Sequence, residues 1–140
     1  MAALSNIAYD SRFRNMTKVT ITWTSAANGT VATSPLEQID GDLIKAVTIP
    51  AAGGSAPTDN YDIDITDAAG VNILTNCKVG LHDRDTANTE EQYFFVLNND
   101  STALSMAKSP VVCDILTVTV TNAGDTKSGT IILYFRPSRA

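Results

Sequence analysis

The sequence predicts an all-β protein, an antiparallel β-sandwich of about eight strands arranged as a jelly roll. Several segments alternate apolar and polar residues with a period of two, which is typical of half-buried strands. The composition is rich in threonine, valine and isoleucine, which suit a pleated sheet, and no segment is long enough for a crossover helix. The 140 residues fit one domain.

An immunoglobulin-like sandwich is the alternative, because the chain has one tryptophan and two cysteines. In that fold the tryptophan lies between the cysteines, whereas Trp23 precedes both Cys77 and Cys113. The jelly roll is therefore favoured. The two cysteines form neither a metal-binding nor a redox motif, and free buried thiols are expected.

Residues 1–16 show neither strand alternation nor a capped helix, and we interpret them as an extended N-terminal arm before a single jelly-roll domain, residues 17–140. The arm mixes aromatic with basic side chains, namely Tyr9, Phe13, Arg12 and Arg14. Docking on the same subunit or on a neighbour would remove the aromatic side chains from water, and an ordinary frayed terminus is the alternative.

The first half of the domain predicts four strands in order. Thr17–Thr24 places Val19, Ile21 and Trp23 on one face, so that the tryptophan is expected in the core. Asn28 and Gly29 then predict a hairpin turn. The remaining expected elements are a strand at 30–34 stopped by Pro35, a loop at 36–42, a strand at 43–49 with Leu43, Val47 and Ile49 on one face, a loop at 51–60, and a strand at 61–66 with Tyr61, Ile63 and Ile65 inward.

The carboxylates around the last of these strands raise the question of a metal or catalytic site. Calcium needs six to eight converging oxygens, and glycoside hydrolysis needs two carboxyls in distinct environments. The spacing of Asp59, Asp62, Asp64 and Asp67 matches neither requirement, so a solvated acidic strand face is expected, with no metal and no cofactor.

The only histidine, His82, stands beside Asp83 in a polar stretch, residues 80–91, that predicts a surface loop. Adjacent residues of an extended chain point to opposite faces, and no serine or cysteine occupies a nucleophile elbow. We therefore expect no enzyme activity.

The second half predicts strands at 71–77 and 92–97, the latter central and covered on both faces, a loop at 98–110, and a terminal hairpin of residues 116–121 and 130–136. Leu116, Val118 and Val120 alternate, whereas Ile131–Phe135 is apolar at every position. The second face of that strand is expected to be covered by the N-terminal arm or by a twin subunit.

The net charge of the chain and its distribution along the sequence limit the kinds of partner that the protein is expected to bind. The net charge of −5 argues against nucleic acid, which needs a basic surface. Basic residues gather near the two ends of the chain and acidic ones between them, so the termini either contact an acidic surface or are simply solvated. No secretory signal or membrane span is recognised, and synthesis in a reducing cytoplasm is expected.

Four segments, 56–63, 67–70, 83–90 and 120–129, resemble small proteins encoded beside the capsid genes of tailed phages. The chain is similar over most of its length to capsid cement, or decoration, proteins, most closely to the jelly-roll cement protein of the Bordetella podophage type. The shared motifs are turns and strand ends, not a catalytic signature.

The resemblance implies a structural virion protein that binds the outer surface of the assembled shell, synthesised in the bacterial host cytoplasm. Its partner would be the major capsid protein, and it would be a homodimer. Contacts with capsid neighbours or the twin subunit are expected at Tyr9, Arg12, Phe13, Arg14, Tyr134, Phe135, Arg136 and Arg139. A receptor-binding or carbohydrate-binding jelly roll is the alternative, and would present exposed aromatic side chains in a groove.

Overall fold

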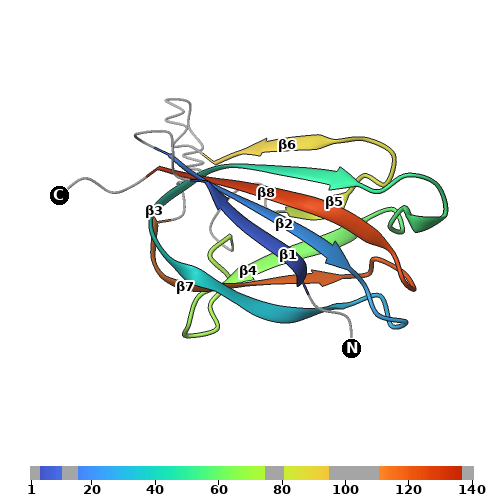
Figure 1. The fold of residues 1–140 in the computed structure, drawn as a ribbon, viewed down its shortest axis with the longest axis horizontal. Helices are drawn as coiled ribbons and strands as arrows, with labels where there is room; N and C mark the ends of the chain where they lie inside the picture. Colours follow the sequence, from blue (N-terminus) through green and yellow to red (C-terminus); the bar gives the residue numbers. More distant parts are fainter. Residues whose placement is uncertain (1–3, 11–15, 75–80, 95–110, 137–140) are drawn as a thin grey trace, which may run out of the picture.

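The computed structural model describes residues 4–10, 16–74, 81–94 and 111–136, and in this part of the chain the strands form an antiparallel sandwich (Figure 1). The all-β class is therefore confirmed. The elements are β1 (Leu4–Asp10), β2 (Thr17–Thr24), β3 (Val31–Pro50), the 3-10 turn η1 (Gly53–Ser55), β4 (Tyr61–Thr66), β5 (Leu81–Arg84), β6 (Glu90–Tyr93), β7 (Val111–Thr121) and β8 (Ser128–Arg136).

The strands lie in two layers that share the long strand β3 (Figure 1). One layer, which we call the β8 sheet, has the order β1-β2-β8-β3-β6 and uses the second half of β3. The other, the β7 sheet, has the order β3-β7-β4-β5 and uses the first half. The hydrogen-bonded path is continuous because β3 crosses from one layer to the other.

The order of pairing is that of a jelly roll. If β1 is set aside and β3 is counted as two strands, the first strand pairs with the last, β2 with β8. The two halves of β3 pair with β7 and β6, and the innermost pair is β4 with β5. This nesting of antiparallel pairs, wrapped around one core, confirms the predicted topology.

The crossing of β3 overturns the predicted stop at Pro35 and the predicted loop at 36–42. Asp42 is opposite Val111 of β7 and also Arg136 of β8, so the chain changes layers at this point, next to Gly41 at φ 145°. Proline is tolerated because this half of β3 pairs, among the described strands, only with β7, and the register shifts beside Pro35.

A second register shift, between Leu43 and Lys45, corrects the predicted faces of this strand. Leu43 points into the core, whereas Val47 and Ile49 lie opposite the outward residues Ile132 and Thr130 of β8. The extra residue in β3 reverses the alternation, as a β-bulge does. Leu43 therefore does not share a face with Val47 and Ile49.

Two predicted hairpins are wrong for a common reason. Strands β7 and β8 follow each other in the chain but lie in different layers, each hydrogen-bonded to one half of β3. The turn at Asn28 and Gly29 is present, with the Gly29 N–H donating to the Ala26 carbonyl at 2.9 Å, yet it also joins the two layers. Turn residues in the sequence indicate only that the chain reverses its direction. They do not indicate whether the two flanking strands pair with each other, which depends on the rest of the sheet.

Three other expectations also need correction. Residues 4–10, expected as an arm without strand structure, form β1 along β2, where Ile7 packs against the core. Residues 81–84, expected in a loop, form β5. The strand β6, expected at the centre of a sheet, has four residues and pairs only with β3 among the described strands. Of the strand expected at 71–77, the structure shows one bridge, Asn72 with Thr66; residues 75–80 and the loop at 98–110 lie outside the described residues.

The core between the two layers follows the period-two pattern. The predicted inward residues of β2, β4 and β7 are all buried: Val19, Ile21, Trp23, Tyr61, Ile63, Ile65, Leu116, Val118 and Val120. Each large apolar side chain removed from water stabilises the fold by about 1.5–3 kcal/mol. The same pattern sends the remaining residues of these strands to the two outer faces, and those faces are where a partner could bind.

Candidate functional site

Strand β8 has one buried face and one open face. Ile131, Leu133 and Phe135 are at most 1% exposed, whereas Ile132 and Tyr134 on the opposite side are half-buried. Within the described part of the chain nothing covers this second face, and its cover by a twin subunit or another partner stays a prediction. The strand β1 does not cover the open face, because it extends the sheet beyond β2.

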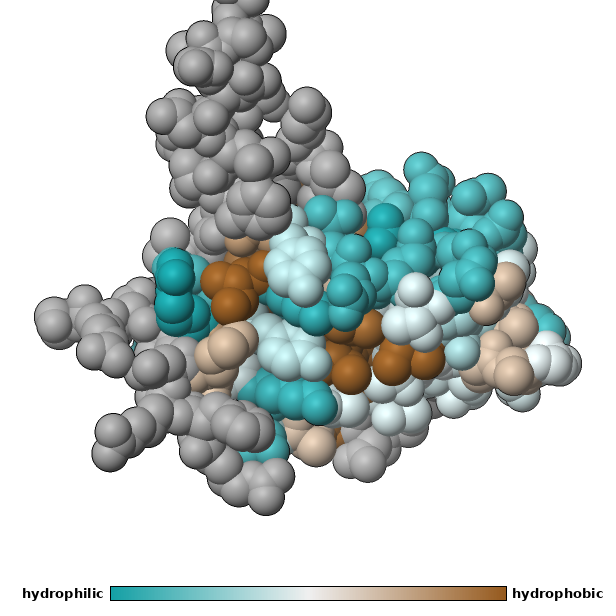
Figure 2. Space-filling model, turned by 90° about the horizontal axis from the view of Figure 1, so that it is seen from above, coloured by the Kyte–Doolittle hydropathy of each residue, from teal (hydrophilic) through white to brown (hydrophobic). Residues whose placement is uncertain are grey.

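The open face continues across the neighbouring strands, and we call it the β8 face. Cross-strand partners of Ile132 and Tyr134 lie on β2 and β3, and those of the β3 residues lie on β6. The β8 face consists of Lys18, Thr20, Thr22, Lys45, Val47, Ile49, Glu91, Tyr93, Thr130, Ile132 and Tyr134. Figure 2 looks down on the upper strands of Figure 1 and shows brown apolar surface among paler and teal polar side chains.

Lys45 organises one end of the β8 face. Its Nζ donates to Glu91 Oε1 at 2.8 Å and lies 5.1 Å from the ring centre of Tyr93 and 5.4 Å from that of Tyr134. The hydrogen bond to Glu91 raises the pKa of Lys45, which therefore stays charged. Tyr93 is nevertheless 50% exposed. The cluster is a preorganised, partly apolar surface with its charges paired.

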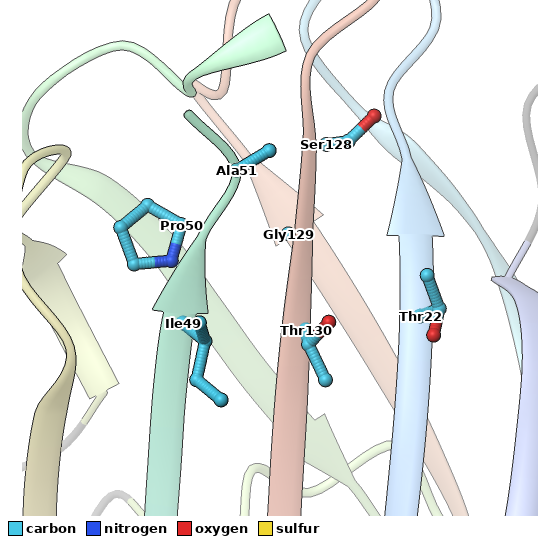
Figure 3. A pocket seen from close by; sticks show the side chains of 7 residues that line it. All are labelled: Thr22, Ile49, Pro50, Ala51, Ser128, Gly129 and Thr130. Atoms are coloured by element: carbon cyan, nitrogen blue, oxygen red, sulfur yellow. The ribbon is translucent and has the colours of Figure 1, made fainter. Parts of the chain in front are cut away.

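The other end of the β8 face is hollowed, with a volume of about 290 Å³ (Figure 3). The hollow forms where the start of β8 carries only small side chains, with β3 on one side of it and β2 on the other (Figure 3). Its lining contains no charged residue: Thr22, Ile49, Pro50, Ala51, Ser128, Gly129 and Thr130. The β8 face thus combines an aromatic end with an apolar, hydroxyl-lined depression.

The predicted contact residues that the structure describes are not brought together in one place. Tyr9 docks on its own subunit, where its hydroxyl accepts from the Glu37 N–H at 2.7 Å, and it is 36% exposed. Tyr134 lies on the β8 face, and the exposed Arg136 bonds to Asp42 at 3.2 Å. The prediction that Phe135 contacts a partner is wrong, because its side chain is buried in the core of its own subunit. Arg12, Phe13, Arg14 and Arg139 lie outside the described residues.

Two of the carboxylates weighed as a metal site, Asp62 and Asp64, lie on the outer face of the β7 sheet and are engaged by hydrogen bonds. Asp62 accepts from the Asp83 N–H at 3.0 Å and from Asn122 Nδ2 at 2.8 Å. Asp64 accepts from Asn72 Nδ2 at 2.6 Å. Among the described residues no cluster of metal-ligating side chains is present.

His82 pairs across strands with Asp64, not with its neighbour Asp83. The Nε2 to Oδ1 distance is 2.8 Å, and this hydrogen bond raises the pKa of His82. The imidazole side chain is 59% exposed on an open strand face. In the described part of the chain no serine or cysteine bonds to it, so the pair connects the edge strand β5 to β4.

The two outer faces differ in charge. The β8 face and the adjoining end of β8 present Lys18, Lys45 and Arg136 beside an equal number of acids. The outer face of the β7 sheet presents Asp62 and Asp64, and within the described ranges no exposed lysine or arginine accompanies them. The described lysine, arginine and acidic residues are therefore balanced in number at the β8 face, whereas at the outer face of the β7 sheet the acids stand without an exposed described lysine or arginine.

Comparison of the chain with models of protein families, with curated proteins and with solved structures finds no match. In the described ranges the model has no helix of the length and hydropathy needed to cross a bilayer. The fold and the geometry of the outer faces are thus the structural basis for a functional proposal.

Sequence reasoning singled out Tyr134 and missed most of the β8 face. Lys45, Tyr93 and Thr22 come from segments far apart in the chain, and Tyr93 was expected inside a central strand. A usable indication was the alternation of Lys45, Val47 and Ile49, which places two aliphatic residues on the outward side once the bulge is known.

Proposed function

We propose that the protein is a structural virion protein that binds the outer surface of a tailed-phage capsid and stabilises it by bridging neighbouring capsid subunits. The observation that carries this proposal is the β8 face, where Tyr93 is 50% exposed and Ile49, Ile132 and Tyr134 are partly exposed on the outer side of the sheet. Tyrosine enrichment and depletion of unpaired charge are the composition of protein interfaces. The resemblance of the turn segments to cement proteins names the partner, the major capsid protein.

Such binding stabilises a shell through mass action. A protein that binds the closed lattice and not the separated subunits lowers the free energy of the lattice, by about 2.7 kcal/mol per site when its free concentration is a hundred times the Kd. A subunit that contacts two capsid subunits, or a homodimer that contacts more, gains further from multivalency. The resistance of the shell to disruption therefore rises with occupancy.

The proposal is for a binding role, and the geometry of the titratable groups supports that role over catalysis. Asp62, Asp64 and His82 are tied to each other or to neighbouring amides on an exposed strand face. A catalytic pair works in a site that excludes water and aligns a substrate. An open sheet face offers neither property.

Binding of a host receptor or a carbohydrate is the second candidate, and one observation favours it. Tyr93 is 50% exposed, and the half-buried Tyr134 shares the contact with Lys45, so this end of the β8 face offers the aromatic surface that such a module would need. Sugars stack on the open faces of aromatic rings. Because Lys45 Nζ lies against both rings, at 5.1 and 5.4 Å from their centres, it competes with a stacked sugar for them.

The experiment that tests the proposal mixes the purified protein with capsid shells that lack it. We expect the protein to co-sediment with the shells and to raise the temperature at which they are disrupted. Dissociated capsid subunits are the matched control and should retain much less of it. Absence of co-sedimentation contradicts the proposal, and selective binding on a glycan array would then support the second candidate.

A further inference from the structure

The strand β1 (Leu4–Asp10) forms one edge of the β8 sheet, and among the described strands it is hydrogen-bonded only to β2 (Figure 1). An edge strand of this kind is a template for the addition of a further strand. We propose that the outer edge of β1 pairs with the same edge of a second copy of this chain. The two strands run antiparallel, so that the β8 sheets of two subunits form one continuous sheet.

The other described edges of the sandwich carry features that oppose the addition of a strand. The strands β5 and β6 have four residues each, with Asp83 at φ 54° in the first and two glutamates at the start of the second. The first half of β3 contains Pro35, which has no N–H to donate, and the Glu37 N–H donates to the Tyr9 hydroxyl at 2.7 Å. Short, charged, irregular and proline-containing edges are the usual protection against association.

The edge of β1 does not share this protection. The strand has seven residues and no proline, and its one charged residue, Asp10, is the last. Its register shift lies between Leu4 and Asn6, so that residues 6–10 pair regularly with β2. Ala8, at the middle of this regular stretch, is exposed. A long, regular and weakly charged edge is the type that associates with another strand.

The regular part of β1 is complementary to itself. In an antiparallel pair centred on Ala8, Ile7 lies opposite the partner's Tyr9. In the same register Asp10 lies opposite the partner's Asn6, so like charges do not meet. Ile7 and Tyr9 both lie on the side of β1 that faces the core residues of β2, where Tyr9 is 36% exposed. Pairs of an aromatic and a β-branched side chain stabilise antiparallel sheets.

The pairing determines what a dimer presents to a partner. The two-fold axis of such a pair stands perpendicular to the sheet, so the β8 faces of both subunits point the same way. Together they form one surface with two hollows and two clusters around Lys45. The use of this surface rests on the proposed function, in which two contacts with the shell strengthen binding through multivalency. The pairing of the strands does not depend on that function.

The test places like charges on the two-fold axis. Ala8→Glu brings two carboxylates opposite each other in the proposed pair, next to both copies of Asp10, while a single subunit accommodates the exposed side chain. Gln92→Glu is the matched control, because it adds the same charge to the edge strand β6. Sedimentation velocity measures the dimer dissociation constant after circular dichroism has established folding. We expect Ala8→Glu to raise this constant at least about tenfold and Gln92→Glu to leave it unchanged.

Hydrogen exchange locates the contact in the wild type. We expect the protection of the amides of residues 6–10 to increase with protein concentration and to be lost in Ala8→Glu. Protection that does not depend on concentration would make another segment of the same chain the occupant of this edge. Protection gained only on shells would make the capsid protein the occupant. Either result overturns the inference.

Shell binding separates the inference from the proposed function. If the wild type forms the β1 dimer and does not bind shells, the proposed function fails and the pairing stands. If the wild type binds shells as a monomer, or if Ala8→Glu dimerises as the wild type does, the proposed function stands and the inference is overturned. If both are correct, Ala8→Glu binds shells at least about tenfold more weakly, because the second contact is lost.

Discussion

At the scale of single residues, Gly129 is a position in the core where no side chain fits without displacing its neighbours. A Cβ at this position would lie 2.6 Å from Trp23 Cζ2 and 3.1 Å from the Ile49 carbonyl oxygen. The indole ring therefore lies directly on the β8 backbone, where it is 0% exposed. Glycine is required by the close approach of a large side chain, not by a turn.

Gly129→Ala is accordingly expected to lower the free energy of unfolding by about 1–3 kcal/mol, the usual cost of overpacking. Urea denaturation followed by the fluorescence of the single tryptophan measures the loss. Gly54→Ala is the control, because a Cβ there has nothing within 4 Å, and it should leave stability unchanged within about 0.5 kcal/mol. Equal stability of the two variants would contradict the packing described for Trp23.

His82 gives a prediction about pH. Its pKa is raised in the folded protein, first by the hydrogen bond to Asp64, with Asp62 and Asp83 adding to the effect. The stabilisation is therefore fully present below the unfolded pKa of about 6.5 and is lost as the pH rises through the folded value. It is small, about 0.2–1 kcal/mol, because the pair is exposed to solvent.

A proton NMR titration measures this pKa without ambiguity, since the chain has one histidine. Asp64→Asn should lower the pKa of His82 towards its ordinary value. An unchanged pKa in the variant would show that the bond to Asp64 is not formed in solution, and a pKa below the ordinary value in the wild type would contradict the sign.

The alternation of apolar and polar residues predicted the core, but it did not predict the cluster of Lys45, Tyr93 and Tyr134 on the surface. Val19, Ile21 and Trp23 were found from their alternation alone, because a period of two reports burial directly. The contact of Lys45 with Tyr93 and Tyr134 joins three strands, and no local pattern specifies which strands become neighbours. For the same reason Phe135 was grouped with Tyr134, although successive residues of a strand point to opposite faces.

At the scale of elements, β3 shows the limit of turn signals. Pro35, Gly41 and the polar residues around them predict a break, and the strand continues through them for 20 residues. Proline occupies an edge and glycine the change of layer, both places where a strand tolerates them. The proline and glycine correctly indicate where the strand is irregular. The chain nevertheless stays extended there, because its two halves are hydrogen-bonded to β7 in one layer and to β8 in the other.

Strand β1 makes the N-terminal segment part of the folded domain. It pairs with β2 from Leu4 to Asp10, and Tyr9 reaches the other layer through Glu37. Deletion of residues 1–14 would thus do more than remove a contact arm. We expect it to lower the free energy of unfolding by about 2–4 kcal/mol, because Ile7 leaves the core boundary and the edge of β2 is exposed.

Tyr9→Phe separates the hydrogen bond from the strand. It removes only the hydroxyl that accepts from the Glu37 N–H, and should cost about 0.5–1.5 kcal/mol. Denaturant unfolding and size-exclusion chromatography check both variants. If the deletion were as stable and as monodisperse as the wild type, β1 would be dispensable and the alternative interpretation of this segment, an ordinary frayed terminus, would be favoured.

At the scale of the whole molecule, the jelly roll creates two outer faces with different chemistry. One carries the paired carboxylates Asp62 and Asp64, and the other carries tyrosines, aliphatic residues and a hollow. A protein that attaches to a shell through the second face would present the first to solvent, where its charge opposes aggregation of decorated particles. Under the proposed function, the fold would thereby give the molecule a defined orientation on the shell.

That orientation is measured most directly by electron cryomicroscopy of shells that lack the protein, before and after saturation with it. The account predicts additional density on the outside of the shell, into which the sandwich fits with β2, β8 and the second half of β3 against the capsid and Asp64 towards solvent. Absence of additional density would contradict the proposed function. Density with the β4–β7 face against the capsid would contradict the assignment of the β8 face.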